Sequence, residues 1–291
     1  MGKGFQRCPP EPSMRWQVRK ATPVMSDTIR VITRGDDCGS SHSANLGMME
    51  AAQAGLLKNI SVMATCPFIE EAAEMFAGRA EFCFGLHATL SAEWDAVKWG
   101  PILPAELVPS LVDERGLFFT GPHIFRERPP RMQEILAELQ AQLDKVKRLG
   151  FPIAYVDSHM MIEWGVDGLE EQMCAWTAQE GLLYHVYYDR PLPQGEPNSD
   201  PVEAFISRLE ALQPGQYLFH AHPAVDSSEL RALGNKDEAG EQLAVKRSLD
   251  IQLFTDPRVL ACYERRHILP LRYDQAESTR SGLPRPDEPL R

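Results

Sequence analysis

Short runs of β-branched and aromatic residues alternate with longer segments of helical periodicity along most of this 291-residue chain. Runs of this composition, bounded by turn-forming residues, are typical of β-strands. They predict strands over residues 30–33, 60–64, 82–86, 153–156, 184–188, 217–221 and 268–272.

The intervening segments have the residue spacing of amphipathic helices. Between Met132 and Leu149 the apolar side chains recur mostly three and four residues apart, and the pattern ends at Gly150. Comparable patterns predict further helices, the last of them broken near Asp256-Pro257. These helices cover residues 43–56, 68–77, 168–181, 201–212 and 240–265.

This order of elements is typical of α/β folds with a mostly parallel sheet, either closed as a (β/α) barrel or open and doubly wound. No internal repeat is evident. Residues 1–28 lack periodicity, and residues 276–291 lack apolar anchors. We therefore predict a single domain over residues 29–275, flanked by a flexible N-terminal extension and a flexible C-terminal tail.

Composition narrows the class of protein. Apolar residues make up 43% of the chain and charged residues 24%, as in a globular protein. The formal net charge is -11 and no long Lys/Arg run is present, which argues against nucleic acid as a partner. No apolar run is long enough to span a bilayer, so we expect no membrane partner. The six cysteines form no C-x-x-C pair, and we expect reduced thiols in a cytoplasmic protein.

Polar side chains capable of chemistry follow several of the predicted strands. Because active sites of parallel α/β folds gather at the carboxyl ends of the strands, these side chains should share one rim. Adjacent carboxylates repel each other, so a pair at a strand end suggests a role for the charge, such as holding a metal ion or activating water. The residues in question are Asp36, Asp37, His87, His159, His220 and His222.

One carboxylate and two imidazoles make a common open metal site, which leaves positions for water and substrate. Asp37, His87 and His159 are far apart in the sequence, so this site depends on the fold. The alternative is that each histidine bonds backbone at a strand end and that the aspartates begin the next helix. Suitable N-cap residues do follow, namely Ser40, Ser41 and Ser43.

Several ordered motifs resemble those of the YdjC-like carbohydrate deacetylases. The resemblance covers about residues 30–273 and is specific because the motifs keep the order and spacing of the family. They are Gly35-Asp36-Asp37-Cys38-Gly39 with Asn45, Gly85-Leu86-His87-Ala88-Thr89-Leu90, Pro109-Ser110-Leu111-Val112-Asp113 with Gly116-Leu117-Phe118, Val156-Asp157-Ser158-His159, and His220-Ala221-His222-Pro223.

The resemblance implies a distorted (β/α) TIM-like barrel and divalent-metal-dependent removal of acetyl groups from N-acetylated sugars. It assigns metal binding to Asp37, His87 and His159, and the role of general base to Asp36. His222, in the family's His-Pro context, is the candidate general acid. His220 is the alternative, because residues two apart on a strand point to the same side.

The resemblance also implies a small carbohydrate substrate and a homodimer. The sequence favours Mg²⁺ or Zn²⁺ as the metal, although Mn²⁺ and Co²⁺ suit the same ligands. Two other functions stay open. The same machinery could hydrolyse another amide or an ester, or the chain could be a sugar-binding relative without turnover.

Some residues have a structural and a functional interpretation. Met160-Met161 stand where many family members have further histidines, which suggests altered substrate recognition. For Cys38 we favour a small buried filler over a metal ligand. For Asp157, orientation of His159 or Asp36 competes with a role in a turn.

The same choice applies to the tryptophans and the arginine of this region. Trp94 and Trp99 could stack on a sugar, but we favour anchoring of their loop. For Arg247 we favour a salt bridge on a helix face over contact with a site carboxylate. We assign no function to the remaining histidines, His42, His123, His185 and His267.

Overall fold

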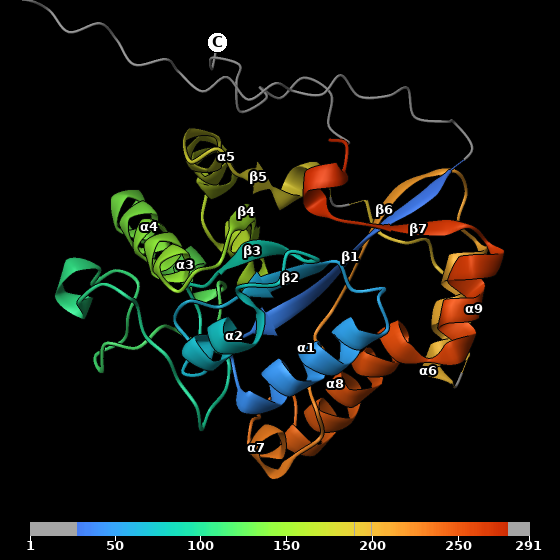
Figure 1. Cartoon of the computed structure of the whole chain (residues 1–291). Coiled ribbons are helices and arrows are strands. Elements are labelled where there is room, and N and C mark those ends of the chain that lie inside the picture. Colours follow the sequence, from blue (N-terminus) through green and yellow to red (C-terminus); the bar gives the residue numbers. More distant parts are fainter. Residues whose placement is uncertain (1–27, 189, 199, 279–291) are drawn as a thin grey trace, which may run out of the picture.

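The computed structural model describes residues 28–188, 190–198 and 200–278, and within them seven strands form one sheet (Figure 1). Every neighbouring pair of strands runs parallel. The strands are β1 (Ile29–Cys38), β2 (Asn59–Val62), β3 (Cys83–Ala88), β4 (Ile153–Ser158), β5 (Leu183–Tyr184), β6 (Gly215–Ala221) and β7 (Ile268–Leu271).

The sheet curls into a half-barrel. Its strand order is β5-β4-β3-β2-β1-β6, and β7 also pairs with β1. A bridge between Pro191 and Leu218 links the segment after β5 to β6, and the Leu218 amide donates to the carbonyl of Arg190 at 2.7 Å. The two ends of the curled sheet thus approach each other, and the predicted distorted (β/α) barrel is confirmed.

Helices surround the sheet, as Figure 1 shows, with α4 and α5 at one side and α6 and α9 at the other. Asp256 caps α9 by accepting from the Arg258 amide, and Pro257 occupies the first turn, so the predicted break is confirmed. The helices are α1 (His42–Gln53), α2 (Ile69–Phe76), α3 (Ile124–Glu127), α4 (Met132–Arg148), α5 (Leu169–Gln179), α6 (Pro201–Glu210), α7 (Ser228–Arg231), α8 (Gly240–Thr255) and α9 (Pro257–Arg265).

Within the described residues, four short 3₁₀ segments accompany these strands and helices. They are η1 (Ala105–Leu107), η2 (His159–Gly165), η3 (His185–Tyr187) and η4 (Tyr273–Gln275). One of them corrects the sequence prediction, because the strand expected over 184–188 ends at Tyr184 and continues as η3. Glu163 accepts hydrogen bonds from the Tyr184 hydroxyl and the His185 ring, which holds the chain in a turn there.

The first strand also differs from the prediction. It was expected over 30–33, but β1 continues through both aspartates to Cys38. Paired cations relieve the charge that would otherwise disfavour this, since Arg34 binds Asp36 and Arg247 binds Asp37. The interpretation that the aspartates begin the next helix is therefore wrong, and Ser41 caps α1.

Other predictions concern the ends of the chain, its cysteines and the membrane. Residues 1–27 and 279–291, which cover nearly all of both predicted extensions, lie outside the described residues. In the described part of the chain, no helix has the length and apolar character that crossing a membrane requires. The five cysteines of that part are free: Cys38, Cys66, Cys83, Cys174 and Cys262.

Candidate metal centre

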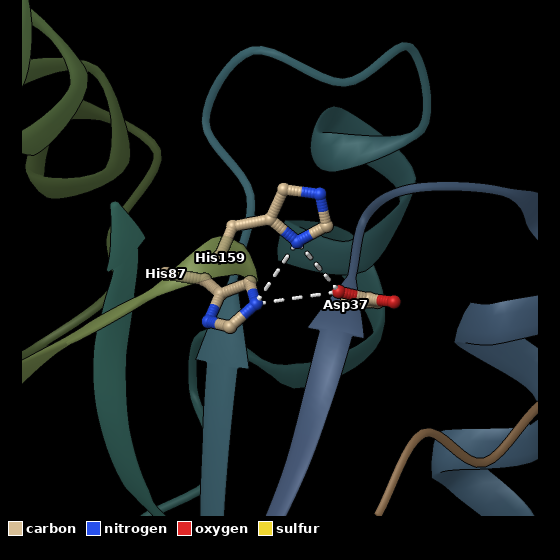
Figure 2. Close-up of side chains that lie close together, drawn as sticks. All are labelled: Asp37, His87 and His159. Carbon is tan, nitrogen blue, oxygen red and sulfur yellow. Dashed lines mark hydrogen bonds and ion pairs between the residues drawn. The ribbon is translucent and has the colours of Figure 1, made fainter. Parts of the chain in front are cut away.

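Three parallel strands deliver the candidate metal ligands to one rim of the sheet. Asp37 lies near the end of β1 with a positive φ of 67°, His87 lies in β3, and His159 begins η2 directly after β4. All three side chains are buried. The structure therefore brings together residues that the sequence separates widely, as Figure 2 shows.

The three side chains converge on a common point. The Oδ1 oxygen of Asp37 lies 3.3 Å from Nε2 of His87 and 3.4 Å from Nδ1 of His159. The two ring nitrogens are themselves 3.3 Å apart. These atoms form a nearly equilateral triangle of potential ligands.

The opposite nitrogen of each imidazole is held by a carboxylate. Nδ1 of His87 lies 3.0 Å from Oδ2 of Asp157, and Nε2 of His159 lies 2.9 Å from Oε2 of Glu93. Because a carboxylate accepts, each of these nitrogens donates, and in the neutral ring the lone pair belongs to the other nitrogen. Both lone pairs then face Asp37 Oδ1, which is buried without a hydrogen-bond partner.

This donor set suits a divalent cation. Orientation of metal-bound histidines by carboxylates is a common feature of protein metal sites. Ligands about 2.1 Å from a tetrahedral ion lie about 3.4 Å from one another, and the observed triangle has this size. The residues present therefore fit a metal ion.

Protons compete for the same positions when no ion neutralises the carboxylates. Burial opposes protonation of His87, but Asp157 and Asp37 outweigh it and raise the pKa of His87 to about 10. Burial likewise opposes protonation of His159, and Glu93 and Asp37 raise its pKa to about 9.

Arg247, on α8, holds the second oxygen of Asp37. Its Nη1 atom lies 2.6 Å from Asp37 Oδ2, and its guanidinium lies 5.9 Å from the ring centre of Trp94. Burial alone would raise the pKa of Asp37, but Arg247 and the two histidines lower it well below its ordinary value. The structure thus places Arg247 against a site carboxylate, whereas the favoured prediction was a salt bridge on a helix face.

Asp36 lines the same cavity as Asp37 and is paired with Arg34. Nε and Nη2 of Arg34 lie 2.6 and 2.8 Å from the two oxygens of Asp36. Arg34 also lies 3.2 Å from Asp157 and 3.0 Å from the Tyr273 hydroxyl. Burial opposes ionisation of Asp36, but Arg34 lowers its pKa far below the ordinary value, so the group stays charged.

A cavity of about 590 Å³ opens over these groups. His220 and His222 line it, and the His222 amide donates to Asp250 at 2.9 Å. Burial lowers the pKa of His222 to about 3, although the charge of Asp37 acts in the opposite direction. Desolvation and Arg34 lower the pKa of His220. His220 and His222 are therefore neutral imidazoles at rest, beside ionised carboxylates.

The remaining candidates have structural positions. Cys38 is buried and burial raises the pKa of its thiol, in agreement with the filler interpretation. Trp94 and Trp99 are each only 5% exposed, and Trp99 donates to the Ser91 carbonyl, so they anchor the loop as favoured. Asp157 orients the ring of His87 rather than that of His159, and it acts on Asp36 only through Arg34.

Two residues of the site escaped the sequence analysis. Glu93 lies in the irregular segment after β3, where no periodicity marks it. Arg34 precedes Asp36 by two positions and so shares its side of the strand, which was an available signal. His185, to which no function was assigned, lines the cavity wall and lies 3.3 Å from Glu163.

Several known proteins similar to this chain are carbohydrate deacetylases. A carbohydrate deacetylase from Thermoanaerobacter pseudethanolicus is 35% identical over 44% of this chain and 49% of its own length. A carbohydrate deacetylase from Enterococcus faecalis is 33% identical over 45% of this chain and 48% of its own length. The matches thus span about half of these two relatives. A third, from Geobacillus stearothermophilus, is 31% identical over 79% of this chain and 91% of its own.

A solved structure shares the fold. It is a putative cellobiose-phosphate cleavage protein from Enterococcus faecalis, superposable with a TM-score of 0.71 at 24% identity over 85% of this chain and 98% of that one. Residues 30–199, more than half of the chain, match the family described as YdjC-like protein. With this match and the nearly full-length Geobacillus relative, the chain belongs to the YdjC-like family.

Proposed function

We propose that this protein is a divalent-metal-dependent hydrolase that removes acetyl groups from N-acetylated amino sugars. One observation carries the proposal: two histidine lone pairs and the unpartnered Oδ1 of Asp37 converge at 3.3 to 3.4 Å. The carbohydrate deacetylases among its relatives support the substrate class. The net reaction adds water across the amide C–N bond and gives acetate and a free amine.

Asp37, His87 and His159 would hold the ion. Zn²⁺ suits their spacing better than Mg²⁺, since neighbouring ligands of an octahedral ion at about 2.1 Å are only about 3.0 Å apart. A divalent cation supplies Lewis acidity here, which polarises an amide carbonyl and makes water acidic enough to deprotonate near neutral pH.

Two further groups divide the proton transfers. Asp36, kept ionised and fixed by Arg34, is the base that takes the proton of the attacking water. His222 protonates the leaving amine. Because its ring is neutral at rest, His222 receives the proton that Asp36 took from the water and passes it to the amine, which returns both groups to their starting states. His220, on the same cavity wall, is the alternative donor.

The cavity supplies the means to bind a small carbohydrate. Charged and amide groups that suit sugar hydroxyls line it together with apolar side chains. Asn235, Glu238, Lys246 and Asp250 form the polar part. We also retain the predictions of a cytoplasmic location and of a homodimer. A sedimentation measurement on the purified protein checks the oligomeric state.

The test is acetate release. Protein stripped of metal and then loaded with Zn²⁺ or Mg²⁺ should release acetate from N-acetylglucosamine or diacetylchitobiose, and the stripped protein should not. Non-sugar acetamides and acetate esters in the same panel separate this activity from general amide or ester hydrolysis. No release from any sugar by the loaded protein would reject the proposal.

A further inference from the structure

The wall of the cavity next to His159 has an unusual backbone. Among the described residues, four non-glycine residues have positive φ: Asp37, Met160, Met161 and His267. Three of them line the cavity. Met160 (φ 54°, ψ 23°) and Met161 (φ 51°, ψ 56°) are consecutive left-handed residues, which is unfavourable for a side chain of this size. Strained residues of this kind cluster at functional sites.

Contacts on both sides of the methionines hold the strained segment in place. Glu163 accepts hydrogen bonds from the Ser158 hydroxyl, the Tyr184 hydroxyl and the His185 ring. Arg126 donates twice to the Trp164 carbonyl, at 3.0 and 3.2 Å. Gly165 packs so closely that an added Cβ would lie 2.2 Å from the carbonyl oxygen of Pro122. The turn is therefore fixed by groups other than the methionine side chains.

The methionine side chains do little for this anchoring and are open to the cavity. Met160 is 41% exposed and Met161 39%. One contact orients the first of them, since Ser91 Oγ lies 3.4 Å from its sulfur. This rigid turn presents two large apolar side chains beside a metal ligand. Its strained backbone disfavours folding, and the exposed side chains contribute little packing that would offset this.

The cavity has further apolar lining. Leu218 and Phe219 of β6 and Pro191 line it together with the methionines, and charged groups, among them Lys246 and Asp250 of α8, line it as well. The cavity is thus amphiphilic. Methionine suits an apolar subsite, because its unbranched, polarisable side chain adapts to the group that it contacts.

We infer that Met160 and Met161 form a subsite for an alkyl group carried by the amino sugar. This inference rests on the proposed function, which puts the substrate amide beside His159 and so brings its substituents within reach of the next two residues. The alkyl group belongs either to an acyl chain longer than acetyl or to an aglycone on the sugar. In both cases the apolar chain binds the methionine wall while the sugar hydroxyls face the charged groups.

Matched substrates and a matched variant test this. The Zn²⁺-loaded protein is assayed on N-acetylglucosamine, N-hexanoylglucosamine and hexyl N-acetyl-β-glucosaminide. At least one of the two substrates with a six-carbon chain should have a kcat/KM about tenfold or more above that of N-acetylglucosamine, since one methylene in an apolar pocket can be worth that much. Which of the two gains shows whether the subsite takes the acyl chain or the aglycone.

The double variant Met160→Asn/Met161→Asn should lower the ratio of hexyl to plain substrate toward one. Asparagine tolerates the left-handed backbone, so the turn is kept while the apolar surface is lost. Leu107→Asn, which changes a 63% exposed leucine outside the cavity lining, should leave the ratio as in the wild type. Melting temperatures verify that both proteins are folded.

Binding of hexyl β-glucosaminide and of N-hexanoylglucosamine, measured by calorimetry against glucosamine and N-acetylglucosamine, separates the two proposals. Tighter binding of either six-carbon compound that is lost in the double variant supports the subsite even if no sugar is deacetylated. Hydrolysis of N-acetylglucosamine with no preference for either hexyl substrate overturns the subsite and leaves the proposed function intact. Neither hydrolysis nor binding rejects both.

Discussion

The Nδ1 nitrogen of His87 lies 3.0 Å from Oδ2 of Asp157, its direct partner in the register of β3 and β4. Asp157 is fully buried and also lies 3.2 Å from Arg34. One carboxylate therefore links the imidazole that faces Asp37 to the cation that fixes Asp36. The orientation of both parts of the site depends on this contact between two neighbouring strands.

Asp157→Asn should weaken metal binding. A neutral acceptor holds the His87 ring less firmly in the tautomer that directs its lone pair at Asp37. Loss of such a partner typically lowers metal affinity about 10- to 100-fold. Calorimetric titration of the stripped protein with Zn²⁺ measures the change. Asp144→Asn, on the exposed face of α4, is the control and should bind as the wild type does. An unchanged Kd in folded Asp157→Asn protein would contradict the assigned role.

Glu93 should act in the same way on His159, with a graded response. Glu93→Ala removes the acceptor for Nε2 of His159, and we expect a loss in Zn²⁺ affinity of about 10- to 100-fold. Glu93→Gln retains an acceptor oxygen at the same distance from the backbone, so it should bind more tightly than the alanine variant. Equal affinities of the two variants, both below that of the wild type, would mean that Glu93 contributes charge alone.

The sequence predicted the parts of the site that strand geometry determines. Asp37, His87 and His159 were selected because parallel strands end at one rim, and the same rule holds in the folded sheet. Glu93 could not be selected, because its contact with His159 spans 66 residues from an irregular segment. Only the path of the loop after β3 brings it there.

Competing contacts explain where the secondary structure was predicted wrongly. The composition of residues 184–188 favours a strand, but hydrogen bonds from Tyr184 and His185 to Glu163 turn the chain. The length of β1 was underestimated for the opposite reason. Two adjacent aspartates look unfavourable in a buried strand until Arg34 and Arg247, one in the same strand and one on α8, are placed beside them.

The two adjacent aspartates should not be interchangeable. Asp37→Asn removes a charged ligand and should reduce the metal content of the purified protein, measured by elemental analysis. Asp36→Asn should retain the metal but lower kcat on the order of 10²- to 10⁴-fold, since it removes the proposed base. Arg34 keeps its ion pair with Asp157 in the second variant, so the strand should stay folded. Equal metal loss in both variants would refute this division of roles.

Glu163 should make stability depend on acid pH. Burial opposes its ionisation, but hydrogen bonds from His185, Ser158 and Tyr184 lower its pKa to about 2 from the ordinary 4.5. A depressed pKa in the folded state stabilises the protein above the pKa of the unfolded chain. This contribution, about 3 kcal/mol at most, is lost as the pH falls from about 4.5 to about 2.

Glu163→Gln should remove this part of the acid dependence. Urea unfolding of wild type and variant between about pH 2 and pH 7 measures it, and the two free energies of unfolding should converge as the pH falls. Glu74→Gln, at an exposed position of α2, should keep the wild-type profile. A constant difference between wild type and Glu163→Gln across this range would show that charge on Glu163 does not stabilise the fold.

Close packing of α1 against the segment after β6 should make Gly47 intolerant of substitution. A Cβ at Gly47 would lie 2.4 Å from the Cα of Ala224, and the neighbouring Val225 amide donates to the Ser43 carbonyl at 2.9 Å. Backbone cannot move aside as a flexible side chain can, so Gly47→Ala should lower the free energy of unfolding by about 1–3 kcal/mol.

Gly78→Ala is the matched control, because nothing lies within 4 Å of its added Cβ and the position is exposed. It should leave stability unchanged or raise it by up to about 1 kcal/mol, through a less flexible unfolded chain. Urea unfolding near neutral pH measures both variants. Since Ala224 follows His222 by two residues, Gly47→Ala should also lower kcat, and an active, equally stable variant would mean that this contact does not position the histidine.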